Sequence, residues 1–508
     1  MITEWIDQAA AGRGDASYLE DAAGDGVLTF AGLRRAAAAW AGSLDRAGVA
    51  PGAAVALRWP DPLGYATALV GIIAAGRVVV PLDPAAPGSE LSRMLAVARP
   101  QVVVSDAPAR DLPTGLTVLR PDPQTEALER LAGPSGTGGI FLCTSGTTGA
   151  PKGILLRDDQ LSHVAAAVAS HHRLSPADRG YCCLPLFHIN AEVVGLLATL
   201  AARACLVLDR RFSRRGFWPL AEKKEITWIN AVPAIITVLA MDPFFSAERP
   251  GARVRFIRSA SAPLAPATLE RFEQAFGIPV VETYGMTEAA SMITANPLDG
   301  PRKAGSVGLP AGAEVRIVPV PGAADAVGRV QIRGRGVITR YAAGGPAGAV
   351  DPDGWLDTGD LGRFDSDGYL FLAGRSDDVI NRGGEKIYPR EIEDFLLACD
   401  GVSSAAVVAA ADEVLGERPV AYVVPAGSWS PDKLEYALRE ACEAGLPRAK
   451  RPSAFVVLEE MPLGRTGKIS RRRLRELATA PGRFSGRQVL PQVAAQGAVF
   501  ETRSELPA

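Results

Sequence analysis

The 508-residue sequence predicts an α/β fold: a large N-terminal domain of layered βα sheets with a β-rich subdomain, followed by a small, mobile α+β C-terminal domain. Short apolar runs alternate with segments of helical periodicity as far as Val280, a pattern typical of strands buried on both faces. From Ala313 to Leu372 the sequence changes to short β-rich pieces broken by Gly and Pro. The length exceeds one ordinary core, so two domains are expected.

The spacing of apolar residues predicts the first elements of the large domain. Leu33, Ala37, Trp40 and Leu44 fall at helical spacing, and Gly48 marks the end of that helix. Strands are expected at residues 55–57, 78–82 and 102–104, with a helix between the first two.

The small domain is expected to follow a charged segment. Pro389 suits the first turn of a helix over residues 390–398, and strands are expected at 405–408 and 421–424. We place the domain boundary near residues 375–378. The domains are therefore residues 1–375 and 376–478, and residues 479–508 form a polar tail with Gly and Pro that is expected to be flexible.

Composition narrows the classes of function. Hydrophobic residues make up 47% and charged residues 22%, which is typical of a globular protein, and no run of about eighteen apolar residues could span a membrane. The net charge of −2 gives no reason to expect nucleic acid or anionic lipid as a partner. The six cysteines form no CxxC pair and the chain has four histidines, so a zinc site is not expected. The first ten residues lack the features of a signal peptide, and the expected compartment is the cytoplasm.

A loop rich in Gly and Thr follows the strand expected over residues 139–143. Glycines let backbone amides converge on an anion, hydroxyls add donors, and a lysine adds a positive charge. A plain turn is the alternative, but only eight of the 54 basic residues are lysines, which favours phosphate binding. This Gly- and Thr-rich loop is not the GxxxxGK[ST] phosphate-binding loop, because Gly153 follows Lys152 and a helix is expected only near Asp158. The candidate phosphate-binding residues are Thr144, Ser145, Gly146, Thr147, Thr148, Gly149 and Lys152.

Residues 282–288 (Glu-Thr-Tyr-Gly-Met-Thr-Glu) should leave the carboxyl end of a strand, the edge at which open α/β sheets bind ligands. Tyr284 could pack against a base or an acyl group, Thr287 could hydrogen-bond a phosphate, and Glu288 could help to hold magnesium. A solvated strand-to-helix turn explains the same residues equally well.

Three other segments allow two interpretations each. An Asp within residues 355–362 could accept both ribose hydroxyls or could cap a tight turn. Residues 374–387 could be a charged linker with a glycine turn, and Lys468 could be a solvated loop lysine, although it is again a rare lysine in a Gly/Thr loop. His188 lies among apolar neighbours, where a histidine with a backbone partner is the ordinary case.

Together, in this order and spacing, these segments resemble the adenylate-forming superfamily, which includes acyl- and aryl-CoA synthetases, adenylation domains of peptide synthetases and firefly luciferase. The resemblance covers about residues 10–475. Residues 383–387 (Gly-Gly-Glu-Lys-Ile) and 284–288 look most like stand-alone acyl-CoA synthetases.

The resemblance implies a role for each segment. Residues 144–153 would hold the β- and γ-phosphates, Thr287 and Glu288 would serve the α-phosphate and magnesium, and Asp360 with Arg375 would bind the ribose. The rest of the AMP-binding set would be Ser261, Ala262, Pro263, Glu282, Thr283 and Tyr284.

The same resemblance implies the residues that act on the acid and the thiol. Lys468 would bridge the substrate carboxylate and the α-phosphate, and His188 would lie beside the acyl group. Asp377 would be the hinge of the small domain, and Gly383 and Gly384 would line the pantetheine tunnel. The walls of the acyl pocket would be Phe187, Ile189, Asn190, Trp228, Ile229, Val232 and Met292, which suits a small, largely apolar acid.

The expected reaction has two steps. A carboxylate cannot lose an oxide, so it first attacks the α-phosphate of ATP with release of pyrophosphate, and a lysine and magnesium offset the concentrated negative charge. The acyl group then passes to a thiol, coenzyme A by preference. A lysine loop must cover the phosphate first and clear the path of the thiol afterwards, which a rotating small domain achieves.

Three alternatives accompany this interpretation. Amino-acid-activating relatives have Asp after the Phe of residues 184–190, and His188 in that place disfavours an α-amino acid. The chain could instead load an acyl or aryl group onto a separate carrier protein. A luciferase-like oxygenase or a nucleotide-binding regulator is disfavoured by Lys468 and the tunnel glycines.

Overall fold

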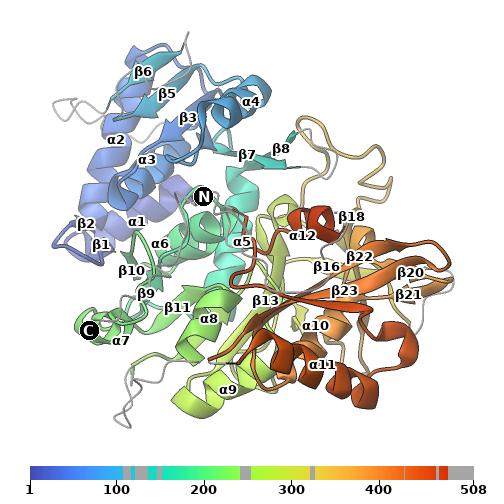
Figure 1. Cartoon of the computed structure of the whole chain (residues 1–508). Coiled ribbons are helices and arrows are strands. Elements are labelled where there is room, and N and C mark those ends of the chain that lie inside the picture. Colours follow the sequence, from blue (N-terminus) through green and yellow to red (C-terminus); the bar gives the residue numbers. More distant parts are fainter. Residues whose placement is uncertain are drawn as a thin grey trace.

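The structure is a computed structural model of the chain, and it describes residues 1–106, 116–120, 136–145, 151–240, 253–320, 326–427, 429–464 and 468–478. The fold is α/β, as the sequence predicts. Figure 1 shows the elements of the C-terminal part, in orange and red, gathered on one side of the larger N-terminal part.

The first sheet of the large part is mostly parallel. Its order is β6 (Thr117–Leu119), β5 (Val102–Ser105), β3 (Ala54–Arg58), β4 (Val78–Pro81), β7 (Gly139–Ser145) and β8 (Pro151–Arg157). All residues of β4 and β5 are buried, because helices on both faces require apolar side chains on both faces. The predicted strands and early helix are confirmed: α2 spans Phe30–Arg46 and α3 spans Pro62–Ala74. The remaining helices of this region are α1 (Ile2–Arg13) and α4 (Gly88–Ala98).

The second sheet carries most of the candidate site. Its order is β15 (Leu309–Pro310), β14 (Ser291–Ala295), β13 (Val280–Met286), β12 (Phe256–Ser259), β11 (Trp228–Ala231), β9 (Arg179–Cys182), β10 (Cys205–Leu208), β1 (Ser17–Asp21) and β2 (Val27–Thr29). Its helices are α5 (Asp158–His171), a π-helical segment η2 (Asn190–Leu197), α6 (Ala198–Ala201), α7 (Phe217–Lys223), α8 (Pro233–Ala240) and α9 (Pro266–Phe276). The segment η2 contacts β9, β11 and β14, so it covers one face of this sheet.

A smaller antiparallel sheet completes the large part. It contains β16 (Glu314–Pro319), β17 (Gly328–Arg333), β18 (Leu356–Phe364) and β19 (Leu370–Arg375) in sequence order. This is the β-rich subdomain that the sequence predicts after Ala313.

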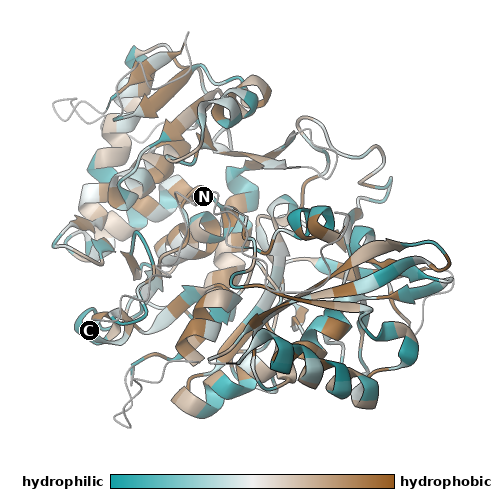
Figure 2. Cartoon of the chain, viewed as in Figure 1, coloured by the Kyte–Doolittle hydropathy of each residue, from teal (hydrophilic) through white to brown (hydrophobic). Residues whose placement is uncertain are grey.

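The C-terminal part has its own sheet and its own core. The sheet runs β21 (Glu385–Ile387), β20 (Ile380–Arg382), β23 (Gly416–Pro425) and β22 (Val402–Asp412), with β24 (Ala454–Val457) pairing with β23. Its helices are α10 (Pro389–Ala398), α11 (Pro431–Gly445) and α12 (Arg471–Ala478). Pro389 occupies the first turn of α10, as predicted. Figure 2 shows α11 largely hydrophilic on its outer side, while Leu434, Leu438 and Cys442 face the core.

Buried apolar residues form separate clusters in the two parts. The clusters of the large part end at Leu370, and those of the small part begin at Ile380. Among the described residues, no helix is long and apolar enough to cross a membrane. All six cysteines are described and unpaired.

Two segments for which the sequence leaves alternatives open take strand form. Residues 283–286 continue β13 past its parallel neighbour β12 and form a hairpin with β14, and a single 3₁₀ turn η3 (Thr287–Ala289) follows in place of a longer helix. Gly285 is required there, because a Cβ at this position would lie 1.4 Å from the carbonyl oxygen of Ser291. Within residues 355–362, where the sequence allows either a ribose-binding Asp or a capped turn, residues 356–364 form strand β18, in which Gly359 adopts a positive φ of 72°.

Candidate active site

An acidic residue on β18 gathers three partners. Asp360 lies opposite Arg375 in the register of β18 and β19, and its Oδ1 is 3.2 Å from Arg375 Nη1. The hydroxyl of Tyr284, in the part of β13 that pairs antiparallel with β14, donates to Asp360 Oδ2. Burial raises the pKa of Asp360, while Arg375, Tyr284 and Lys468 hold it down. The structure thus brings together Tyr284, Asp360 and Arg375, all three predicted to bind nucleotide.

The lysine of the small part reaches the same place. Lys468 is an exposed residue, but its amine is desolvated, and this desolvation is the main cause that lowers its pKa. The charge of Asp360 raises the pKa of the amine, and the charge of Arg375 lowers it. Burial and, as the smaller cause, the charge of Lys468 together lower the pKa of His188 to about 4. Lys468, from the C-terminal part, therefore lies within electrostatic reach of His188 and Asp360, which belong to the large part.

His188 is neutral and incompletely bonded. Its Nε2 is buried, and none of the described residues bonds to it, while its ring lies 4.6 Å from the ring of Phe187. A buried polar atom in a protein core ordinarily has a hydrogen-bond partner. The imidazole therefore has a free nitrogen at the position that the resemblance assigns beside the acyl group.

A tyrosine links the predicted metal ligand with the predicted phosphate lysine. Glu288 is 8% exposed, and its Oε1 accepts a hydrogen bond of 2.9 Å from the hydroxyl of Tyr341. The amine of Lys152 lies over the Tyr341 ring, 5.7 Å from its centre. Gly153 exchanges backbone hydrogen bonds with residues 342 and 343, which fixes β8 beside this tyrosine. Sequence reasoning missed Tyr341.

The structure leaves part of the phosphate loop outside the described residues. Gly146, Thr147, Thr148 and Gly149 lie in the range 146–150, and of Ser145 only the backbone is described, at the end of β7. Thr144 pairs with Lys152 across β7 and β8, so the two limbs of the loop lie side by side. Thr287 is half-buried at the start of η3, next to Glu288.

Asn190 belongs to a buried polar network. Its Nδ2 donates to Ser261 Oγ at 3.1 Å, and its Oδ1 accepts from Arg258 Nη1 at 2.8 Å and from Asn230 Nδ2 at 3.3 Å. Ser261 is exposed and has a positive φ of 74°, and Ala262 and Pro263 follow it. The network therefore runs from Ser261, an exposed residue of the predicted AMP-binding set, to the interior. Sequence reasoning missed both Arg258 and Asn230.

The other predicted pocket residues are more scattered. Trp228 stacks on Phe256 at 6.0 Å between ring centres and lies against Gly180. Successive strand residues point to opposite faces, so Trp228 and Ile229 do not share a face. The structure therefore does not bring all of the predicted walls together. Phe187 and Val232 are partly buried, and Ile189 and Met292 are buried.

Glu282 connects the two parts of the chain. Its Oε1 accepts from the backbone amide of Leu264 at 3.3 Å and lies 4.0 Å from Nη2 of Arg390, a residue of α10. Burial raises the pKa of Glu282 to about 7, which Arg390 opposes. Arg390 also lies 3.5 Å from Asp394 one turn along α10. The neighbouring Thr283 donates to the carbonyl of Ser259 at 3.2 Å, so its hydroxyl is used within the fold.

The predicted hinge and tunnel residues lie near the start of the small part. Asp377 lies in the 3₁₀ turn η4 (Ser376–Asp378), and its carbonyl accepts from Arg475 Nη2 at 3.3 Å. Gly383 and Gly384 form the exposed turn between β20 and β21, with φ of 60° and 91°. A Cβ on Gly384 would meet nothing within 4 Å.

The comparisons with known proteins agree with this arrangement. The chain matches the family described as "AMP-binding enzyme" over residues 6–342 and the "AMP-binding enzyme C-terminal domain" over residues 391–468. It is 38% identical to a sulfoacetate–CoA ligase of Cupriavidus necator, over 91% of this chain and 94% of that protein. It is 35% identical to an oxalate–CoA ligase of Arabidopsis thaliana, over 84% and 88%. The ATP-bound MatB structure from Rhodopseudomonas palustris superposes with a TM-score of 0.85 and 27% identity, over 94% and 99%.

Proposed function

We propose that this chain activates a small carboxylic acid with ATP and magnesium and transfers its acyl group to coenzyme A. The chain belongs to the AMP-binding enzyme family and is an AMP-forming acid–CoA ligase. Loading of a carrier protein is not favoured, because the similar proteins are named as ligases of coenzyme A. The observation that carries the proposal is the cluster in which Tyr284 and Arg375 bond to Asp360, with Lys468 within electrostatic reach of Asp360.

In the first step an oxygen of the substrate carboxylate attacks the α-phosphorus of ATP, and pyrophosphate leaves. Asp360 is the residue to accept the ribose hydroxyls, because Arg375 and Tyr284 fix both of its oxygens in place. Lys468 would lie between the carboxylate and the α-phosphate, where a cation offsets the charge that builds up in the transition state.

Glu288 and Thr287 are proposed to hold magnesium. Magnesium prefers oxygen ligands, and Glu288 offers a carboxylate that Tyr341 orients through one oxygen only. The metal would neutralise part of the phosphate charge. Lys152 would meet the β- and γ-phosphates with the amides and hydroxyls of residues 144–149.

In the second step the sulfur of coenzyme A attacks the acyl carbon, AMP leaves, and the thiol proton passes to solvent. Lys468 must then withdraw, so we propose that residues 376–478 rotate about Asp377 and bring Gly383 and Gly384 to the thiol path. The separate cores on either side of residues 370–380 support this boundary. The tail of residues 479–508, which the sequence predicts to be flexible, lies outside the described residues.

The acid is proposed to be small, with an apolar body against Phe187, Ile189 and Val232. The cytoplasm, expected from unpaired cysteines, stays a prediction.

The test is pyrophosphate release from ATP across a panel of small acids, with and without coenzyme A. We expect acid-dependent release and, with coenzyme A, a thioester product. Absence of release with every acid would contradict the proposal, and thioester formed only on a phosphopantetheinylated protein would favour the carrier-protein alternative.

A further inference from the structure

Arg258 is a buried cation without a counter-ion. The residue is 1% exposed, and no carboxylate of the described residues lies within 4 Å of its guanidinium. Its hydrogen bonds go from Nη1 to the amide oxygens of Asn190 at 2.8 Å and Asn230 at 3.1 Å, and its Nε is buried without a partner among the described residues. Burial lowers the pKa of Arg258 to about 9, so it is still a cation at neutral pH.

The groups around Arg258 do not neutralise it. His172 is fully buried and neutral, because burial and then Arg258 lower its pKa. Cys182 is a neutral thiol, because burial raises its pKa to about 11. Burial and then Arg258 also lower the pKa of His171, and the hydrogen-bond partners of Arg258 are two asparagines. A buried guanidinium surrounded only by neutral groups is costly, and an anion that bonds to it removes most of that cost.

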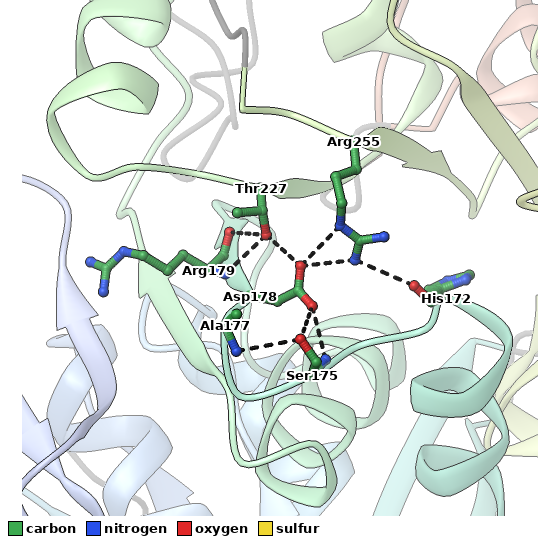
Figure 3. Close-up of polar contacts among 7 residues, drawn as sticks. All are labelled: His172, Ser175, Ala177, Asp178, Arg179, Thr227 and Arg255. Carbon is green, nitrogen blue, oxygen red and sulfur yellow. Dashed lines mark hydrogen bonds and ion pairs between the residues drawn. The ribbon is translucent and has the colours of Figure 1, made fainter.

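Arg255, three residues earlier in the chain, shows how a carboxylate of the fold ordinarily neutralises an arginine. Its guanidinium donates twice to Asp178 Oδ1, at 2.8 and 3.0 Å, and Asp178 is fixed in turn by Thr227 and Ser175. Figure 3 shows this closed network, in which the carboxylate belongs to the fold itself. Arg258 has no such partner, although it is more deeply buried.

The position of Arg258 relates it to the acid. Its partner Asn190 begins η2, two residues after His188, and also bonds to the exposed Ser261. His188 in turn lies within electrostatic reach of Lys468. A hydrogen bond to Asn190 therefore joins the Arg258 guanidinium to the segment that carries His188, which lies within electrostatic reach of Lys468, where the reacting carboxylate is proposed to bind.

We infer that Arg258 binds a second anionic group of the substrate, so the acid is a short dicarboxylic or sulfonated carboxylic acid whose other carboxylate is activated. This inference rests on the proposed ligase function. Asn190 and Asn230 hold the guanidinium fork in place, and its remaining N–H groups are donors for the anion. The apolar side chains would contact only the short body between the two acidic groups.

The direct test compares acids of equal length that differ only in the far group. Pyrophosphate release is measured for malonate, succinate and 3-sulfopropionate, and for propionate and butyrate. We expect the wild-type kcat/KM to be at least about a hundredfold higher for one of the dianionic acids, because an unpaired buried group strongly disfavours the analogue that lacks its partner. The sulfonate arm separates the two anion chemistries.

Arg258→Met should lower the ratio of kcat/KM for dianionic to monoanionic acids by about a hundredfold or more. Pyrophosphate release with the monoacids should stay the same or rise, since the variant no longer buries an unpaired cation. Arg258→Lys should keep part of the wild-type ratio. Arg255→Lys is the matched control, and it should affect thermal stability without changing the ratio of dianionic to monoanionic acids.

Binding supplies a second readout. The dianionic acid, without ATP, should raise the melting temperature of the wild type and not that of Arg258→Met. A wild type that prefers monoacids overturns the inference even if Arg258→Met does not fold, and so does a selectivity ratio unchanged in a folded Arg258→Met. Absence of pyrophosphate release with every acid would instead contradict the ligase proposal.

Discussion

Tyr341→Phe removes one hydroxyl and leaves the ring under Lys152. The lost bond is 2.9 Å long and ends on Glu288 Oε1. Burial and Glu288 both raise the pKa of Tyr341, so the tyrosine is a donor at neutral pH. A hydrogen bond to a charged acceptor contributes about 1.5–3 kcal/mol, and loss of a residue that orients a metal ligand weakens metal binding by roughly 10–100-fold. We expect magnesium binding to weaken at least about tenfold.

The measurement is the magnesium concentration that gives half-maximal pyrophosphate release, with Mn²⁺ binding by electron paramagnetic resonance as a readout independent of turnover. The KM for the acid should stay the same, because Tyr341 contacts neither His188 nor Asn190 in the structure. Tyr369→Phe is the control, since its hydroxyl donates at 2.7 Å to the carbonyl of Pro301, outside the candidate site. Unchanged Mn²⁺ and Mg²⁺ dependence in Tyr341→Phe would refute the idea that Tyr341 orients Glu288.

Three further predictions concern the two half-reactions. Lys468→Ala should slow pyrophosphate release by about 10²–10³-fold yet still convert a supplied acyl-adenylate to thioester, and equal loss of both steps would remove the assigned role. Lys152→Ala should raise the KM for ATP more mildly, because amides and hydroxyls share the phosphate contacts, and an unchanged KM would indicate a plain turn. Gly384→Leu and Asp377→Pro should both keep acid-dependent pyrophosphate exchange and lose thioester formation, the first by filling the thiol path and the second by fixing φ. Because Gly384 has a φ of 91°, Gly427→Leu, at a φ of 68° with nothing within 4 Å, controls for backbone strain.

The sequence predicted local structure where one physical cause dominates. Leu33, Ala37 and Leu44 are all buried on α2, because a helix packed against neighbouring helices, here α1 and α3, needs one apolar stripe. At residues 282–288 and 355–362 the sequence leaves a nucleotide-binding segment and a turn open as alternatives, and strand pairing with β14 and β19 decides the local form.

The site could be predicted only as a set of segments. Asp360, Arg375 and Tyr284 come from three strands, and which oxygen meets which donor depends on strand register. Trp228 and Ile229 show the limit, since both are apolar neighbours in the sequence and yet point to opposite faces of β11.

The sequence contains one sign that Arg258 is unusual. Phe256–Ser259 is a four-residue strand buried throughout, and a charged residue within a fully buried strand needs a partner that the fold or a ligand supplies. Sequence alone could not separate Arg258 from Arg255, three residues earlier, because both are arginines near polar residues of distant segments. Only the three-dimensional structure shows that Asp178 neutralises Arg255 and that Asn190 and Asn230 leave Arg258 charged. The unpaired cation therefore makes the far end of the acid, and not its apolar body, the part of the substrate that this site is built to distinguish.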